Sequence, residues 1–143
     1  MTTVHALNLV GSTALERVEL HIELASLPRA HEWVFWTLRS IVSSPAFNEF
    51  VIWVRSGDYE GRQVDINGWK TVELSLCALA KSKPDFRVVF RGDPPSFLHA
   101  PWGIYDRARL FFETHLPAVL SKGFARIEHV PRVDNPCWEL HSL

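Results

Sequence analysis

Few residues of this chain have the types and spacing that support catalysis or metal binding. His31 and Glu32 are adjacent, but no second histidine lies one helical turn away, so the zinc-protease motif is absent. His129, Cys137 and His141 could offer zinc three ligands near the C-terminus. They lack the paired spacing of zinc sites, and we interpret them as ordinary surface residues. The sequence also has no glycine-rich phosphate loop and no Gly-X-Ser-X-Gly elbow, so we expect no metal and no other cofactor.

Three further patterns have both a chemical and a structural interpretation. His115 could form an acid–base pair with Glu113 or Asp106, but on one helix these residues are better explained as solvated polar groups beside an apolar stripe. Cys77 could be a reactive thiol, but its place in a helical apolar pattern favours a buried small residue. Residues 91–93 spell the integrin-binding tripeptide Arg-Gly-Asp, which we interpret as a strand end that turns into a loop.

Carboxylates in two polar loops leave an enzymatic alternative open. The loops Ser56–Asn67 and Gly92–Gly103 contain Asp58, Asp65 and Asp93. In α/β proteins, ligand sites form in crevices at the carboxyl ends of the strands. The alternative function is therefore a small α/β enzyme with a loop-built site at these strand ends.

Polar and apolar side chains alternate in four short stretches, which predicts four β-strands. Such alternation gives each strand one face toward a core and one toward water. A parallel sheet covered on both faces would instead have nearly continuous apolar strands, so we expect helices on one face only. The stretches are Val18–Leu24, Phe50–Arg55, Phe86–Arg91 and Ala125–Val130, and Val4–Leu9 is a weaker fifth candidate.

Helical patterns separate the predicted strands. Pro28 suits the start of the first helix, and Asn67 can cap the second. The third begins near Asp106, Pro117 should break or kink it, and Gly123 suits its end. The apolar positions expected to face the core are Trp33, Trp36, Leu38 and Ile41 in the first helix, Trp69, Val72, Leu76, Leu79 and Ala80 in the second, and Tyr105, Ala108, Phe112, Leu116, Val119 and Leu120 in the third.

The spacing of the strands predicts a repeat architecture. Their centres are roughly 31, 36 and 39 residues apart, within the range of stacked repeats. The intervals drift, and the asparagine ladder of a regular leucine-rich repeat is missing. The strand–helix–strand order predicts parallel strands with right-handed crossovers. The expected fold is therefore α/β: an irregular leucine-rich-repeat-like β/α solenoid with about four to five mostly parallel strands.

The helix-free face of the predicted sheet is the main candidate for binding. Acidic residues gather on its early strand and basic residues on its later strands, and an exposed tryptophan flanked by arginines is typical of an interface hot spot. Alternatively, Trp53 packs under a loop or tail and the charges are simply solvated. The face would carry Glu19, His21, Glu23, Val51, Trp53, Arg55, Arg87, Val89, Arg91, Arg126 and Glu128, and we expect binding by Glu19, His21, Glu23, Trp53, Arg55, Arg87, Arg91 and Arg126.

Composition narrows the class of protein. The 143 residues suit a single domain, and the formal net charge of −1 lacks the basic excess of a strong nucleic-acid binder. Cys77 and Cys137 are isolated, which favours reduced thiols in an intracellular protein. No signal peptide and no run of about 20 apolar residues is evident, so we expect no membrane partner and a cytoplasmic location.

Four stretches, residues 47–54, 84–93, 116–123 and 127–131, carry a family resemblance. They read FNEFVIWV, PDFRVVFRGD, LPAVLSKG and IEHVP. They resemble the C-terminal region of a large, mostly uncharacterised group of fungal F-box-type or leucine-rich-repeat-like proteins, from about Thr13 to the end of the chain. The matching motifs are structural, so no functional residue is carried over.

The resemblance implies a role beside a ubiquitin ligase. In the family, an N-terminal F-box would recruit a cullin ligase and the repeats would hold the substrate. No F-box precedes the first strand here, so residues 1–143 are expected to be a single substrate-side repeat domain, a C-terminal fragment of a longer solenoid. We also expect self-association through the uncapped strand edge at Val4–Leu9.

Overall fold

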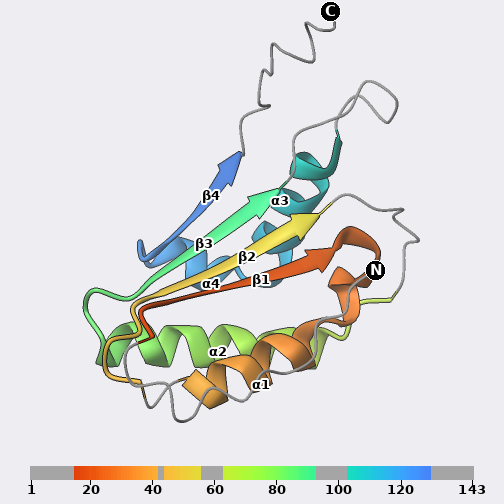
Figure 1. Cartoon of the computed structure of the whole chain (residues 1–143). Helices are drawn as coiled ribbons and strands as arrows, with labels where there is room; N and C mark the ends of the chain where they lie inside the picture. The colour runs from red at the N-terminus through yellow and green to blue at the C-terminus, as the bar shows by residue number, and fades with distance from the viewer. Residues whose placement is uncertain (1–14, 42–43, 56–62, 93–102, 130–143) are drawn as a thin grey trace, which may run out of the picture.

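The computed structural model describes residues 15–41, 44–55, 63–92 and 103–129 (Figure 1). Strands and helices alternate along this part of the chain, as the sequence predicts. The elements are β1 (Arg17–Glu23), the 3-10 helix η1 (Leu24–Arg29), α1 (His31–Ile41), β2 (Glu49–Arg55), α2 (Ile66–Ser82), β3 (Arg87–Gly92), α3 (Gly103–His115), α4 (Pro117–Ser121) and β4 (Ala125–His129). The predicted strand at Val4–Leu9 lies outside the described residues.

The four strands form one parallel sheet in the order β1-β2-β3-β4. Each strand therefore pairs with the strand next to it in sequence, and the α/β class and the parallel direction of the strands are confirmed. The described helices all lie on one side of the sheet (Figure 1). None of the described helices is long and apolar enough to cross a membrane.

One face of the sheet forms the core with the helices. The alternate side chains of β1 and β2 that point to this face are at most 6% exposed. The helices meet them with a stripe that includes Trp69, Leu76 and Phe112, each fully buried. At about 25 cal/mol per Å² of apolar surface, burying each of these large side chains contributes a few kcal/mol. The buried strand residues of this face are Val18, Leu20, Ile22, Phe50, Ile52, Val54, Val88 and Phe90, and Ala125 and Ile127 of β4 are partly buried beside them.

Two expectations about the first two helices are wrong. Trp36 is 50% exposed, because the buried stripe of α1 includes Val34 and Leu38 and Trp36 points away from it. The cap of α2 is Asp65 and not Asn67: the Asp65 carboxylate accepts a hydrogen bond from the Gly68 amide at 2.8 Å. Aspartate at this position satisfies an amide that has no partner within the helix.

Pro117 divides the predicted third helix into α3 and α4, because proline cannot continue the backbone hydrogen-bond pattern. The short helix α4 is held from α2: the carboxylate of buried Glu73 accepts a hydrogen bond from the Ala118 amide at 2.6 Å. Gly123 follows α4 with φ of 87°, a conformation that L-residues rarely adopt.

The turn between α1 and β2 is held by a lysine from α2's end. The ammonium group of Lys83 donates to the carbonyls of Ser44, Pro45 and Phe47 at 3.2, 3.3 and 2.7 Å. Phe47 also begins a row of aromatic rings near the starts of the strands. Its ring centroid lies 5.7 Å from that of Phe86, which lies 6.0 Å from that of Phe124. We call these three rings the phenylalanine row.

Candidate functional site

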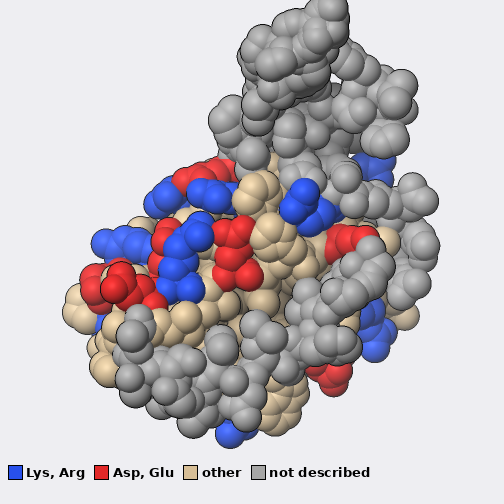
Figure 2. Space-filling view, in the orientation of Figure 1, with Lys and Arg blue, Asp and Glu red and all other residues tan. Residues whose placement is uncertain are grey.

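The second face of the sheet carries no described helix, and we call it the open face. Its side chains alternate with the core residues along every strand, so the predicted assignment of side chains to the two faces of the sheet is correct. Acidic and basic side chains are interleaved over the strands in Figure 2. The open face consists of Arg17, Glu19, His21, Glu23, Glu49, Val51, Trp53, Arg55, Arg87, Val89, Arg91, Arg126 and Glu128.

Strand register arranges these residues in rows that cross the sheet. Because the strands are parallel and in register, one residue from each strand lies side by side with its neighbours. The first row is Glu19, Val51, Val89 and Arg126, and the second is His21, Trp53, Arg91 and Glu128. A shorter row joins Arg17, Glu49 and Arg87.

Trp53 is the centre of an aromatic and cationic group, which we call the tryptophan cluster: Trp53, His21, Arg55 and Arg91. The His21 ring stacks on Trp53 with 5.0 Å between centroids and 28° between planes. The guanidinium carbons of Arg55 and Arg91 lie 5.2 and 5.5 Å from the centroid of the indole ring. Cation–π contacts at partly exposed sites are worth about 0.5–1 kcal/mol each. The indole of Trp53 is therefore held in one orientation while part of it faces solvent.

Hydrogen bonds fix the orientation of the His21 ring as well. Its Nε2 lies 2.5 Å from a carboxylate oxygen of Glu19, and its Nδ1 lies 3.0 Å from Nη1 of Arg55. A carboxylate only accepts and a guanidinium only donates. Both contacts are satisfied together by the neutral imidazole that carries its proton on Nε2 and accepts at Nδ1.

Glu128 joins the two arginines at the β4 side of the open face. Its carboxylate accepts hydrogen bonds from Nε of Arg91 at 2.8 Å and from Nε of Arg126 at 2.6 Å. Partial burial alone would raise the pKa of this carboxyl, but the hydrogen bonds and charges of Arg126 and Arg91 outweigh it and hold the pKa below its ordinary value. Glu128 therefore stays ionised and holds Arg91 against the indole of Trp53.

The β1 side of the open face has its own ion pairs. Arg17 contacts the carboxylates of Glu19 and Glu49 at 3.0 Å each. Pairs at this exposure stabilise a fold by about 1 kcal/mol or less, so their main effect is to order the side chains.

Val51 and Val89 lie on the open face but are fully buried, so they present no surface to a partner.

All eight residues predicted to bind lie on the open face, and the structure brings them into adjacent rows. Arg17 and Glu49 were missed, because the sequence pattern placed each strand start one residue too late. The strand continues to alternate at these two positions, and that is the signal that would have found them.

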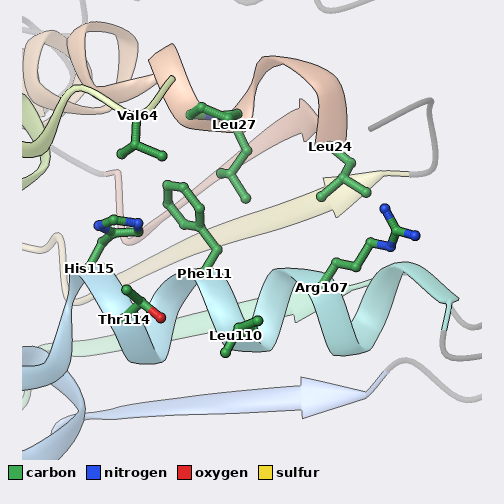
Figure 3. A pocket seen from close by; sticks show the side chains of 9 residues that line it. Leu24, Leu27, Val64, Arg107, Leu110, Phe111, Thr114 and His115 are labelled. Atoms are coloured by element: carbon green, nitrogen blue, oxygen red, sulfur yellow. The ribbon is translucent and has the colours of Figure 1, made fainter. Parts of the chain in front are cut away.

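A pocket of about 250 Å³ lies on the helix side, between η1 and α3 (Figure 3). Phe111 points from α3 toward Leu27 and Val64, while Arg107 and His115 lie at opposite ends of the lining. Burial lowers the pKa of the His115 imidazole, which favours its neutral form. The described lining is mostly apolar and includes no carboxylate, so it does not match the loop-carboxylate site of the enzymatic alternative.

The other candidate catalytic residues have structural contacts. Glu113 pairs with Arg109 at 3.1 Å, while the His115 ring packs against Phe111 with 4.6 Å between centroids. Burial raises the pKa of the Cys77 thiol; of the smaller effects, Lys122 and Lys70 lower the pKa and Glu73 raises it. The raised pKa disfavours the reactive thiolate. The Asp106 side chain lies outside the described side chains.

His31 has an unusual environment that the sequence did not reveal. Its Nε2 lies 3.3 Å from the Asp65 carboxylate and its ring meets Trp69 edge-on, while its buried Nδ1 has no hydrogen-bond partner among the described residues. No group of three metal-binding side chains occurs in the described ranges. The structure does not describe Asp58, Asp93, Cys137, His141 or the side chain of His129.

Comparisons with protein-family models, with curated proteins and with solved structures found no match for this chain.

Proposed function

We propose that this chain is a non-catalytic protein-binding module that holds a protein partner on its open face. The tryptophan cluster carries this proposal. The indole of Trp53 contacts two guanidinium groups and an imidazole, and it lies on a face that no described helix covers. Tryptophan and arginine are the residues most enriched in interface hot spots. Their side chains are already ordered by contacts within the chain, so less conformational entropy is lost when a partner binds.

We further propose that the sheet is part of an irregular leucine-rich-repeat-like solenoid. Two observations support this architecture. Each strand pairs with its neighbour in sequence, and the crossover helices lie on one side. Each ring of the phenylalanine row also comes one or two residues before a strand, as expected for repeat units that stack on one another. In such a fold the strands form the surface that receives the partner.

The resemblance to fungal F-box-type proteins supplies a more specific version of the proposal. In that version, the partner is a protein that a longer adaptor presents to a ubiquitin ligase. This part rests on the resemblance alone. The binding proposal itself depends only on the open face.

Site-specific photo-crosslinking tests the binding proposal. A photoreactive phenylalanine replaces Arg87, which is exposed on the open face, or Leu74, which is 60% exposed on α2 and serves as the control. After irradiation in the expressing cell, we expect a discrete cross-linked protein from the Arg87 position and none from Leu74. Equal cross-linking at both positions, or none at Arg87, would refute the proposal.

A further inference from the structure

We propose that the open face takes a second copy of this chain as its partner, with the two sheets face to face about a twofold axis that runs along the strands. The inference rests on the proposed function, because it uses the same face. It adds the identity of the partner, which is argued from the position of the charges in the rows described above.

The geometry of such an axis is simple. A twofold axis parallel to the strands, between β2 and β3, places β1 opposite β4 of the second copy and β2 opposite β3. The position along the strand is kept, because the strands are parallel and in register. Each residue therefore faces a residue of its own row, taken from the opposite side of the sheet.

The first row is complementary to itself under this operation. Glu19 faces Arg126 of the second copy, and the buried Val51 and Val89 between them add no contact. Because the axis is twofold, the Glu19–Arg126 pair occurs twice. These two charged side chains are accessible: the exposed fractions are 22% for Glu19 and 57% for Arg126.

The second row has the same property. His21 faces Glu128 of the second copy, and the indole of Trp53 faces the guanidinium of Arg91. In the shorter row, Glu49 faces Arg87. These opposed pairs are acid with base, neutral imidazole with carboxylate and indole with guanidinium, so the rows bring no like charges together. A carboxylate has about four lone-pair sites, so Glu19 can keep its internal partners and accept a second donor from Arg126. Both nitrogens of His21 already have partners, so its ring only packs beside Glu128 and does not donate to it.

The size of the face predicts a weak dimer. Four strands about 4.8 Å apart, with about six residues each at about 3.3 Å, cover roughly 400 Å² of projected area per copy. A standard interface buries about 800 Å² per partner, so we expect a dissociation constant of micromolar or higher. Complementary charge then sets the orientation more than the affinity.

Charge reversal separates this interface from contacts within one chain. Glu19 and Arg126 lie three strands apart, about 14 Å, and cannot pair within one copy. In sedimentation velocity from about 1 µM to about 1 mM protein, we expect the wild type to dimerise and Glu19→Arg or Arg126→Glu alone to weaken the dimer at least about tenfold. An equimolar mixture of the two variants should restore it, because each heterodimer contains only attractive pairs. Lys81→Glu, on the exposed side of α2, is the control and should change nothing.

A covalent test covers the case in which a charge variant fails to fold. The double variant Glu19→Cys/Arg126→Cys should be linked into a dimer by a bismaleimide that spans the roughly 10 Å between face-to-face sheets, while Glu19→Cys alone, with the same native thiols, should not. The reagent is chosen too short to span the roughly 14 Å between the two positions within one chain.

Any of three results would overturn the inference. The wild type could stay monomeric at all concentrations, the charge variants could leave the dimer unchanged, or the mixture of variants could fail to restore the dimer. If the protein is monomeric while the photoreactive residue at position 87 captures a different protein, the inference fails and the proposed function stands. If neither dimer nor cross-link forms, both fail.

Discussion

Gly68 occupies a position where an ordinary helix substitution should have the opposite of its usual effect. It lies in the first turn of α2, where its amide donates to Asp65. A Cβ atom added to Gly68 would lie 2.1 Å from Cδ2 and 2.5 Å from Cγ of His31. The imidazole cannot easily move aside, because it is mostly buried, near Trp69 and in contact with the Asp65 carboxylate.

The expected free-energy change follows from two opposing effects. Glycine to alanine in a helix normally stabilises by about 1 kcal/mol. Overpacking a filled site costs about 1–3 kcal/mol, and displacing His31 also weakens its contact with Asp65. We therefore expect Gly68→Ala to lower the free energy of unfolding by about 1–2 kcal/mol.

A double-mutant cycle with His31→Ala measures the clash directly. Once the ring is removed, Gly68→Ala should stabilise the variant by up to about 1 kcal/mol, which gives a coupling energy of about 2–3 kcal/mol. The assay is urea denaturation followed by tryptophan fluorescence, since Trp69 is fully buried and reports unfolding. If Gly68→Ala stabilises both backgrounds equally, the reasoning about His31 is refuted.

Three further predictions concern single residues. Glu73→Ala should destabilise the fold by about 1–3 kcal/mol in chemical denaturation, because the Ala118 amide loses its partner. Glu73→Gln keeps an acceptor and should cost less. Equal losses of stability in the two variants would contradict this. Gly123→Ala should lower the free energy of unfolding by about 1 kcal/mol through its positive φ alone, since no atom of the described residues other than its chain neighbours lies within 4 Å of the added Cβ. An unchanged midpoint of urea denaturation would count against it. The lowered pKa of Glu128 means that its stabilisation is present above the ordinary pKa of 4.5 and is lost as pH falls through the lower folded pKa. Glu128→Gln should therefore flatten the fall of thermal stability below about pH 5, and a parallel profile would exclude this assignment.

The strands could be predicted from the sequence because their pattern is local. Alternation at period two identified β1 to β4 within one or two residues, and it also placed Trp53 and Arg91 on the same face. Pro117 and Gly123 act on the backbone at their own positions, so the helix break and the turn were predictable too.

The features that sequence reasoning missed depend on contacts across the fold. Trp36 fits a helical apolar pattern, but only the packing of α1 on its neighbours decides that Val34 is buried and Trp36 is not. Asp65 and Asn67 are both good cap residues, and the actual start of α2 decides between them. Glu73 lies within the apolar stripe of α2, and no local signal shows that the start of α4 needs its carboxylate.

The order of the strands has a consequence for how this protein is made. Each described strand bonds only to the strand that comes before or after it in sequence. When the chain leaves the ribosome, β1 is already available when β2 emerges, and β3 and β4 can then add to the sheet in turn. The phenylalanine row would close in the same order, so folding can follow synthesis without waiting for a distant segment.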